Sequence, residues 1–496
     1  MKSENDYTRN SGGNGGNAPF DKADFLASLV CDPQYYETPE EDFFRWFEQQ
    51  RNRVCVDIRK IPFARMRDWR FHPETGNIGH VSGKFFTIHG IDISTSHGVK
   101  THWQQPIISQ PEVGILGIVA KKMNGILHFL MQAKIEPGNI NFVQLSPTLQ
   151  ATRSNYTRVH GGQKPLYLEY FTGEAGGNSR ILVDQLQSEQ GARFLKKRNR
   201  NMIIEVFDDI PIYDNFRWLT LGQIKRFMRR DNIVNMDTRT VISSISYGHT
   251  LPDDFECRDA VDEAMLASAT DLGKAYLDMD HHIAWITRLK TLYDLDVTSI
   301  PLDQVSDWIR NDHEIYHRER KYFTVSAVDV TIGNREVKQW TQPIVQSAQE
   351  GIIGFIAKKI NGVYHFLAQA KVEAGNFDIL ELAPTVQCLT GNYRKGLNEY
   401  EVPFLDDFLN ATPAQVLYKT LQSEEGGRFY QEQNLNIIIE VEDDFPVEPL
   451  PQQYTWMTLG QLMEFIRYNN YLNIQARSLL SAIALKVDRP VDFIKK

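Results

Sequence analysis

One stretch of the sequence occurs twice, and it decides how the fold is read. Residues 105–156 read QPIISQPEVGILGIVAKKMNGILHFLMQAKIEPGNINFVQLSPTLQATRSNY. Residues 342–393 read QPIVQSAQEGIIGFIAKKINGVYHFLAQAKVEAGNFDILELAPTVQCLTGNY. The two stretches align without a gap, and about half of their positions are identical. Because a shared core alone preserves apolar positions, the polar residues that also recur indicate two copies of one binding site.

The repeat continues on both sides of the quoted stretches. Trp69 aligns with Trp308, HVSGKFFT at 80–87 with HRERKYFT at 317–324, and QSEQGARF at 187–194 with QSEEGGRF at 422–429. The polar pairs inside the quoted stretches are Lys122/Lys359, Asn124/Asn361, His128/His365, Gln132/Gln369, Lys134/Lys371, Glu136/Glu373, Asn155/Asn392 and Tyr156/Tyr393.

The length of the chain agrees with a duplication. A chain of 496 residues is too long for one ordinary core. We expect a first module at residues 20–250 and a second at 251–496, because Gly, Pro and acidic residues interrupt the pattern between them. Residues 1–19 are rich in Gly, Asn and Ser and are predicted to be a disordered tail.

Composition excludes several classes of protein. The net charge of −9 argues against a non-specific binder of nucleic acid or of membrane surfaces. The four cysteines show neither metal-ligand spacing nor a disulfide framework, which is typical of reduced thiols in the cytoplasm. No apolar stretch approaches membrane-spanning length, and the N-terminus lacks an apolar signal core.

Strand and helix signals alternate irregularly along each copy. Strands joined by hairpins and mixed with helices predict α+β or mixed-sheet α/β modules rather than a parallel βαβ series. Asn124-Gly125 is a tight-turn signal between two strands. We expect strands at 84–93, 114–121, 128–135 and 202–207, and helices at 42–51, 183–194 and 220–230, with 262–292 as a longer counterpart of the first helix.

The second strand of the hairpin carries the clearest candidate site. Alternate residues of a strand share a face, so His128, Gln132, Lys134 and Glu136 lie together, opposite an apolar face. A solvated sheet face explains such a row equally well in a single strand. Its recurrence as His365, Gln369, Lys371 and Glu373 favours a binding site.

Two further polar clusters recur in both copies. Residues 147–160, PTLQATRSNYTRVH, contain Thr148, Gln150, Arg153, Asn155 and Tyr156, and the second copy has no counterpart of Arg153. Arginine suits bidentate phosphate contacts, so this cluster favours anion binding, with an ordinary polar loop as the alternative.

The other cluster is QSEQGARF. It places Gln187, Glu189 and Arg193 at a pocket rim, or Glu189 and Arg193 in a surface ion pair at i,i+4 helix spacing. The second copy repeats the cluster with Gln422 and Glu424.

One literal motif is discounted. His313 to His317 match the HExxH pattern of zinc proteases, which needs both histidines on one helix face. The aligned segment of the first copy contains Pro and Gly and reads as a loop, and only His317 has a counterpart, His80. We therefore expect no metal site. Neither a dinucleotide fingerprint nor a Walker A sequence is present.

The blocks QPII…GILGIVAKK, HFLMQAKIEPGN, QLSPTLQATRSNY and QSEQGARF, with their second copies, resemble the NDP-hexose 2,3-dehydratases over nearly the whole chain after the tail. The resemblance implies a homodimer whose subunit holds two tandem Nudix-like α/β/α modules, each able to carry a nucleotide-sugar pocket. It implies a lyase that acts on dTDP-4-keto-6-deoxyglucose in deoxysugar biosynthesis without a cofactor. A labile product then implies a downstream NADPH-dependent 3-ketoreductase as partner.

The implied chemistry needs a base, an acid and a donor to an enolate oxygen. The 4-keto group acidifies the carbon 3 proton, the carbon 2 hydroxyl leaves by β-elimination, and tautomerisation gives a 3,4-diketo-2,6-dideoxy sugar. Glu136 or His80 is expected to be the base, Lys134 to stabilise the enolate, and Tyr156 or His128 to protonate the leaving group. The resemblance places Arg153 and Asn155 on the pyrophosphate.

The remaining expected site residues fall into two sets. The first-copy set comprises Trp69, Thr87, Gln132, Thr148, Gln150, Gln187, Glu189 and Arg193. The second-pocket set comprises Trp308, His317, Gln369, Lys371, Glu373, Asn392, Tyr393, Gln422 and Glu424. The loops ATRSNYTRVH and CLTGNYRKGL differ most between the copies, and the first copy is favoured as catalytic.

Two alternative functions differ in class from a dehydratase. A Nudix-type nucleotide-sugar hydrolase needs the glutamate-rich Nudix box, and neither copy contains an intact one. A non-catalytic nucleotide-sugar-binding protein that partners another enzyme binds the ligand and turns nothing over.

Overall fold

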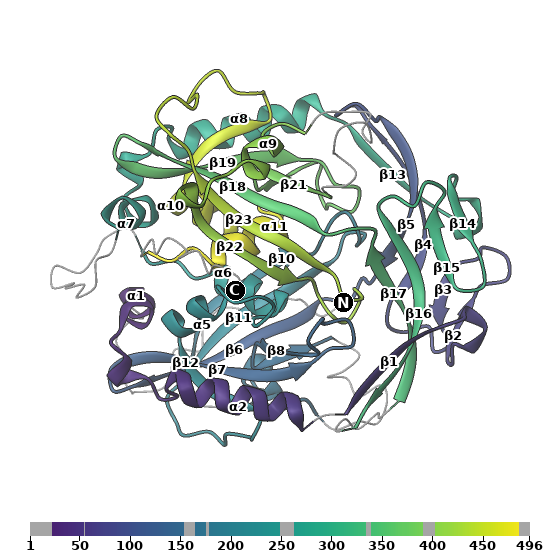
Figure 1. Ribbon diagram of the computed structural model, residues 1–496, viewed down its shortest axis with the longest axis horizontal. Coiled ribbons are helices and arrows are strands. Elements are labelled where there is room, and N and C mark those ends of the chain that lie inside the picture. The colour runs from purple at the N-terminus through teal and green to yellow at the C-terminus, as the bar shows by residue number, and fades with distance from the viewer. Residues whose placement is uncertain are drawn as a thin grey trace, which may run out of the picture.

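The computed structural model describes residues 22–53, 55–152, 164–174, 178–248, 262–333, 339–389 and 402–485. Figure 1 shows two large sheets, one above and one below a central layer of helices, and smaller sheets along one side. The mixture of helices with mixed and antiparallel sheets, built twice, confirms the predicted α/β class with an internal duplication.

The large sheet of the first half runs in the order β10-β11-β6-β7-β12, with β8 on β7 and β9 on β6. The pair β11 and β6 is parallel, whereas β6 and β7 form an antiparallel hairpin. The bounds are β6 (Gly114–Met123), β7 (Ile126–Ile135), β8 (Val143–Ser146), β9 (Leu149–Ala151), β10 (Ser179–Ser188), β11 (Arg198–Val206) and β12 (Phe216–Thr220).

The second half repeats this sheet with the same order and polarity. Its strands follow the order β20-β19-β18-β23-β22, with β21 on β18 and β24 on β19, and the pair β18 and β23 is parallel. The bounds are β18 (Gly351–Ile360), β19 (Val363–Lys371), β20 (Glu381–Ala383), β21 (Val386–Leu389), β22 (Val416–Ser423), β23 (Gln433–Glu440) and β24 (Tyr454–Thr458).

The predicted hairpin turn is confirmed in both halves. Asn124 and Gly125 have φ values of 50° and 81°, and Asn361 and Gly362 have φ values of 53° and 76°. Two successive positive φ values are the conformation of a type I′ turn, whose twist matches that of the flanking strands. Asn and Gly adopt it at little cost, which explains why this dipeptide recurs.

Each half contributes one strand to a smaller sheet of the other half. β1 (Val56–Ile61) pairs antiparallel with β16 (Phe323–Ile332), and β13 (Leu295–Ile300) pairs antiparallel with β4 (Thr87–Thr95). The two halves are therefore interleaved rather than joined end to end. The other strands of these sheets are β2 (Trp69–Phe71), β3 (Ile78–His80), β5 (His102–Ser109), β14 (Trp308–Arg310), β15 (Glu314–His317) and β17 (Gln339–Ser347).

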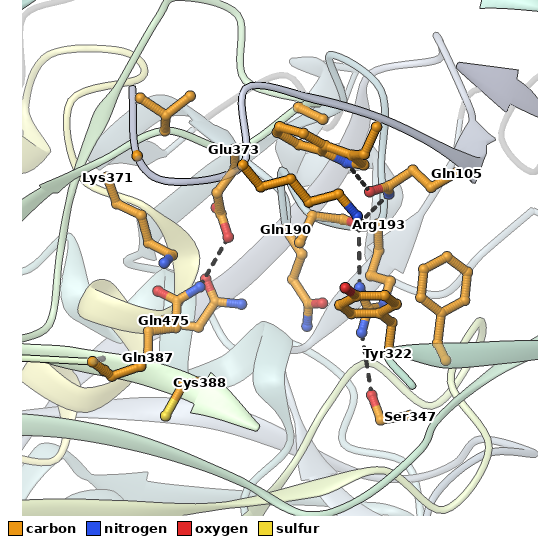
Figure 2. Close-up of a pocket in the computed structure, with 18 of the residues that line it drawn as sticks. Gln105, Gln190, Arg193, Tyr322, Ser347, Lys371, Glu373, Gln387, Cys388 and Gln475 are labelled. Carbon is orange, nitrogen blue, oxygen red and sulfur yellow. Dashed lines mark hydrogen bonds between the residues drawn. The ribbon is translucent and has the colours of Figure 1, made fainter. Parts of the chain in front are cut away.

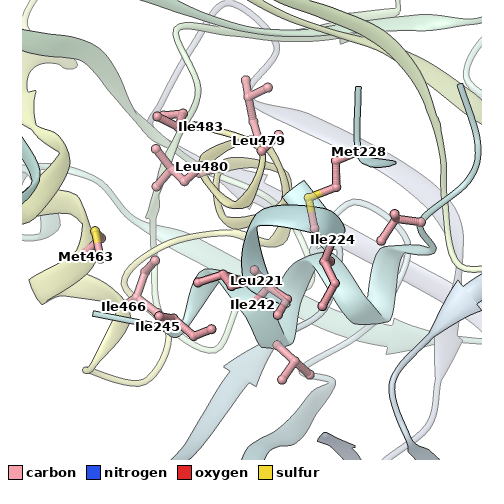
Figure 3. Packing of buried hydrophobic residues seen from close by; sticks show 14 of the residues in the cluster. Leu221, Ile224, Met228, Ile242, Ile245, Met463, Ile466, Leu479, Leu480 and Ile483 are labelled. Atoms are coloured by element: carbon pink, nitrogen blue, oxygen red, sulfur yellow. The ribbon is translucent and has the colours of Figure 1, made fainter. Parts of the chain in front are cut away.

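Helices from both halves meet in one apolar core between the large sheets (Figure 3). The first half contributes Leu221, Ile224, Met228, Ile242 and Ile245, and the second contributes Met463, Ile466, Leu479, Leu480 and Ile483. These residues lie on or next to α5 (Leu221–Phe227), α6 (Met236–Ser243), α10 (Leu459–Ile466) and α11 (Ile474–Ser481). The outer helices are α1 (Ala23–Val30), α2 (Glu40–Asn52), α4 (Leu168–Thr172), α7 (Glu263–Thr270), α8 (Met279–Leu292) and α9 (Leu405–Leu409).

Buried arginines fasten the helical layer to the opposite half. Arg477 of α11 donates from Nη2 to the carbonyl oxygen of Ser188 over 2.5 Å, and Arg239 of α6 donates to the carbonyl oxygen of Ser423. Both side chains are almost fully buried. A buried guanidinium is tolerated where its donors find carbonyl acceptors, so these contacts set how the halves meet.

The helices at 42–51 and 220–230 are confirmed as α2 and α5, and Thr220 caps α5 in a capping box. The helix expected at 183–194 was wrong, because β10 occupies residues to Ser188. A β-bulge between Ile181 and Val183 breaks the alternation that would have indicated a strand. The segment 262–292 forms α7 and α8 rather than one long helix.

The expected module boundary falls mostly on residues 249–261, outside the described part, and stays a prediction. The expected tail at 1–19 also lies outside it. Among the described residues, no helix combines the length and the apolar character needed to cross a membrane.

Candidate active site

Two loops that cross between the halves position the polar clusters. After β7, Gly138 donates its N–H to the carbonyl oxygen of Gly426 over 2.6 Å, and Gln431 donates back to the carbonyl oxygen of Gly138 over 2.7 Å. A Cβ on Gly138 would lie 1.6 Å from the carbonyl oxygen of Phe429. Only glycine therefore fits, and the QSEEGGRF loop of the second half lies against the site region of the first.

The reverse crossing has the same geometry. Gly375 donates to the carbonyl oxygen of Gly191 over 2.7 Å, and Lys196 donates to the carbonyl oxygen of Gly375 over 2.8 Å. A Cβ on Gly375 would lie 1.8 Å from the carbonyl oxygen of Phe194. Each half thus brings its own loop to the site region of the other.

The end of β7 carries the predicted Lys–Glu pair. Lys134 Nζ lies 3.3 Å from Glu136 Oε1. Glu136 is 5% exposed, whereas Lys134 is half-buried. Phe129 and Met131, on the other face of the strand, belong to the main core, as the alternation predicted.

Gln150 joins this pair to a carboxyl group on α6. Its Nε2 donates to Glu136 Oε1 over 3.3 Å and also to Asp237 Oδ2. Asn235 holds Gln150 by donating from Nδ2 to Gln150 Oε1 over 3.4 Å, while its own Oδ1 caps α6 by accepting from Thr238 N. Asparagine is suited to this position because one side chain must both accept and donate.

The second half repeats the arrangement, which here lines a cavity of about 650 Å³ (Figure 2). Gln387 Nε2 donates to Glu373 Oε1 over 2.9 Å, and Asn473 Nδ2 donates to Gln387 Oε1 over 2.7 Å. Lys371 lies beside them, and Gln475 occupies the place of Asp237. The volume suits a small-molecule site.

The first half supplies one wall of this cavity. Arg193 reaches over the Phe323 ring, with its guanidinium carbon 4.2 Å from the ring centroid, and donates to Ser347 Oγ over 3.4 Å. Gln190 and Gln105, also from the first half, point into the same space (Figure 2). Arg193, expected in the first-copy set, therefore lines the second-half cavity, because its loop crosses between the halves.

Most of the second-pocket set meets at this cavity. Trp308, His317, Gln369, Lys371, Glu373 and Glu424 line it. Asn392 and Tyr393 lie outside the described residues.

Burial and like charges shape the titration of the first-half cluster. Burial raises the pKa of Asp237 well above its usual range, and the negative charges of Glu136 and Glu425 raise it further. Burial also raises the pKa of Glu425 to about 7 and lowers that of Lys197 to about 8. Carboxyl groups in such surroundings serve as proton donors and acceptors near neutral pH.

The second-half cluster has a different set of titratable groups beside its Lys–Glu pair, and Glu424 and Glu432 line the cavity with it. Burial raises the pKa of Glu373, and the positive charges of Lys371 and Arg193 oppose the shift. Burial also raises the pKa of Glu424 to about 7. Gln190 and Gln475 stand where the first-half cluster has Glu425, from the crossing loop, and Asp237, whereas Glu381 and Glu432 align with Gln144 and Lys197.

Several predicted residues have structural surroundings instead. His128 is 1% exposed, and its ring nitrogens lie 2.9 Å from the carbonyl oxygen of Ile126 and 3.0 Å from that of Tyr35. It stands six residues from Lys134, roughly 20 Å along an extended strand. The two residues do not share a site.

Thr148, Gln187 and Gln422 form side-chain hydrogen bonds with backbone groups. Thr148 Oγ1 accepts from Val119 N over 2.9 Å. Gln187 Nε2 donates to the carbonyl oxygen of Ile466 over 2.6 Å, and Gln422 Nε2 donates to that of Met228 over 2.7 Å. These glutamines recur because each holds the end of a helix in the opposite half.

The other site residues expected in the first copy lie in two places, near the Lys–Glu cluster and in the smaller sheet that contains β4. Glu189 is 7% exposed and accepts from Asn199 Nδ2 over 2.6 Å. Trp69 and His80 pack edge to face, with ring centroids 5.3 Å apart, and Thr87 is exposed at the start of β4. Gln132 is half-buried on β7. Arg153, Asn155 and Tyr156 lie outside the described residues.

Sequence reasoning missed Asp237 and Glu425. Glu425 lies in the second half of the chain. The sequence of neither half indicates that this loop packs against the other half. A signal for Asp237 was present: Asn235 and Arg239 flank it and recur as Asn473 and Arg477.

The described residues give no sign of a metal centre. Within them, no group of three or more His, Cys, Asp or Glu side chains is arranged to hold a metal ion. His317 lies in the strand β15, whereas the HExxH mechanism needs a helix.

Comparison with known proteins gives a consistent family. The family model for NDP-hexose 2,3-dehydratase matches residues 40–245 and again residues 279–483. A dTDP-4-dehydro-6-deoxy-alpha-D-glucopyranose 2,3-dehydratase from Saccharopolyspora spinosa is 47% identical over 447 residues, which is 90% of this chain and 91% of that protein. The enzyme of the same description from Amycolatopsis orientalis is 42% identical over 475 residues, 95% of both chains. One from Streptomyces violaceoruber is 41% identical over 452 residues, 90% of this chain and 97% of that protein. The chain belongs to the NDP-hexose 2,3-dehydratase family.

Proposed function

We propose that this protein removes the carbon 2 hydroxyl of dTDP-4-keto-6-deoxyglucose, giving a dTDP-3,4-diketo-2,6-dideoxyhexose, and that the reaction takes place in the first half. Relatives that carry this substrate in their names and align over at least 90% of the chain support the substrate. The observation that carries the choice of half is the cluster of Lys134, Glu136 and Asp237 around Gln150.

The Lys–Glu pair suits the first step. The carbon 3 hydrogen and the 4-keto oxygen stand on adjacent carbons, so a base and a cation in direct contact serve both. Glu136 takes the carbon 3 proton, and Lys134, 3.3 Å from Glu136 Oε1, stabilises the enolate oxygen. His80 remains the alternative base; it lies next to Trp69 in the small sheet.

The product has a vicinal diketone and is labile. We therefore propose a downstream NADPH-dependent 3-ketoreductase as partner, a homodimer as the working assembly and the cytoplasm as the location. The absence of a disulfide framework among the four cysteines of the sequence supports that location.

Incubation with dTDP-4-keto-6-deoxyglucose tests the function. The reaction is run with EDTA, with and without a 3-ketoreductase and NADPH, and the sugar nucleotides are separated by chromatography. We expect a reduced dTDP-2,6-dideoxyhexose despite EDTA. Release of sugar phosphate only when a divalent metal is supplied would indicate a hydrolase instead. Binding of the substrate without any turnover would indicate a non-catalytic partner protein.

A further inference from the structure

Asp237 is a buried carboxyl group that the proposed first step does not use. It is the second residue of α6, directly behind the Asn235 cap, and is 5% exposed. Among the described residues, its side chain forms a hydrogen bond with Gln150 alone. A carboxyl group held by one amide retains an oxygen on which it can carry a proton.

Gln150 sets Asp237 and Glu136 side by side. The same Nε2 donates to both carboxyl groups, over 3.3 Å to Glu136 Oε1. Two carboxyl groups this close do not both ionise easily, because each negative charge disfavours the other. One of the pair therefore keeps its proton at a pH where the other is ionised.

The charged neighbours decide which group keeps the proton. Glu136 is in direct contact with the Lys134 ammonium, which favours its ionised form. The negative charges of Glu136, directly after β7, of Glu425, from the second half, and of Glu189, after β10, raise the pKa of Asp237. The positive charge of Lys134 has a smaller effect and lowers this pKa. Arg239, on the same helix, is directed to the carbonyl oxygen of Ser423. Burial and these negative charges raise the pKa of Asp237, so the proton stays on Asp237.

The second half gives an internal comparison. Gln387, Glu373 and Lys371 repeat the set and line the cavity, and Gln475 takes the place of Asp237 in the same lining. Asp237 holds the position in the first half that corresponds to Gln475. An amide holds the same position but cannot deliver a proton.

We propose that Asp237 is the general acid of the elimination, delivering its proton to the carbon 2 hydroxyl as that group leaves. This rests on the proposed function. Glu136 first takes the carbon 3 proton, and the electron pair of that bond moves to the 4-keto oxygen. The enolate then re-forms the carbon 4 carbonyl, a double bond forms between carbons 2 and 3, and the carbon 2–oxygen bond breaks. The leaving oxygen takes the Asp237 proton and departs as water.

The tautomerisation restores both groups. The ionised Asp237 takes the proton of the carbon 3 enol, and the protonated Glu136 delivers its proton to carbon 2. Substrate is thereby converted to diketo product and water with no other reactant, and Glu136 and Asp237 return to their starting forms.

The test separates the two proton transfers in the Asp237→Asn variant. Reaction with dTDP-4-keto-6-deoxyglucose in D2O is followed by NMR, which reports exchange of the carbon 3 hydrogen and formation of product separately. Asn keeps an acceptor for Gln150 and leaves Glu136 in place. We expect exchange to continue within about tenfold of the wild-type rate while product formation falls by about 10²-fold or more. Continued exchange also demonstrates a folded site.

Asp237→Glu and Asp42→Asn are the matched controls. The longer acid is expected to restore part of the elimination rate, and Asp42, on the surface of α2 with its side chain 54% exposed, is expected to behave as wild type. Elimination at the wild-type rate in Asp237→Asn overturns the proposal, and so does loss of exchange together with elimination in a variant with unchanged melting temperature. Absence of turnover by the wild-type protein would instead refute the proposed function.

Discussion

The two halves of the chain carry the same polar frame in different electrostatic surroundings. Lys134, Glu136 and Gln150 of the first half correspond to Lys371, Glu373 and Gln387 of the second, and each glutamine amide donates to the neighbouring glutamate. Beside this frame the first-half cluster has Asp237 and, from the crossing loop, Glu425, where the second-half cluster has Gln475 and, from the other crossing loop, Gln190. The shared residues form the frame, and the proposed proton transfer depends on the one position at which Asp237 is replaced by Gln475.

The largest effect is expected from removing the lysine in each half separately. Lys134→Met deprives the enolate of its cation, and turnover should fall about 10²–10³-fold, the usual cost of losing one electrostatic stabiliser. Lys371→Met should lower turnover by less than about tenfold, because the second half has an amide, Gln475, at the position of Asp237. Steady-state kinetics of both variants measure the difference.

Equal losses of turnover in Lys134→Met and Lys371→Met would contradict the assignment of catalysis to the first half alone. It would then follow that both halves catalyse, or that each site needs the other. A large loss in Lys371→Met alone would transfer catalysis to the second half.

A second pair of variants should show no asymmetry. Gly138→Ala and Gly375→Ala each drive a Cβ into a backbone carbonyl oxygen at the crossing of the halves. Both should lose about 1–3 kcal/mol of stability, or more, because overpacked backbone contacts relax poorly. Melting temperatures measure this. Gly79→Ala is the control, since its Cβ would find its nearest neighbour 3.7 Å away.

Similar losses at both glycines mark the crossing as architecture common to the halves. Destabilisation at Gly138 without any at Gly375 would mean that the two crossings are not equivalent.

The smallest effect concerns pH. Activity should fall as pH rises through the pKa of Asp237, because the general acid is then deprotonated. Glu425→Gln, which copies Gln190 of the other half, removes a negative charge that raises this pKa. The alkaline limb of the pH profile of kcat/KM should therefore move to lower pH. At the pH optimum, kcat/KM should fall by about tenfold or less. A limb that moves upward, or stays in place, would contradict the assigned roles.

The hairpin and the Lys–Glu pair were readable from the sequence because each depends on neighbours along one strand. Asn124-Gly125 has local turn chemistry, and the alternation along β7 places Phe129 and Met131 in the main core, on the face opposite Lys134. The exchange of β1 and β13 between the halves was not readable, because each pairs with a partner 200 or more residues away in the chain. Local pattern carries no information on such a pairing.

The repeat that revealed part of the site also concealed part of it. Recurrence identified Lys134, Glu136 and Gln150, but a residue that differs between the copies, as Asp237 does from Gln475, is invisible to that test. Recurrence also selected His128 and Gln187, whose surroundings are structural. In a duplicated chain, residues that form structural hydrogen bonds recur as well as residues that contact a ligand.

Exchange of the carbon 3 hydrogen in paired glutamate variants tests most directly which half removes the proton. Glu136→Gln and Glu373→Gln are incubated separately with dTDP-4-keto-6-deoxyglucose in D2O, and deuterium at carbon 3 is followed by NMR. We predict that exchange is lost in Glu136→Gln and persists in Glu373→Gln. Persistence in Glu136→Gln with loss in Glu373→Gln would contradict the assignment of catalysis to the first half.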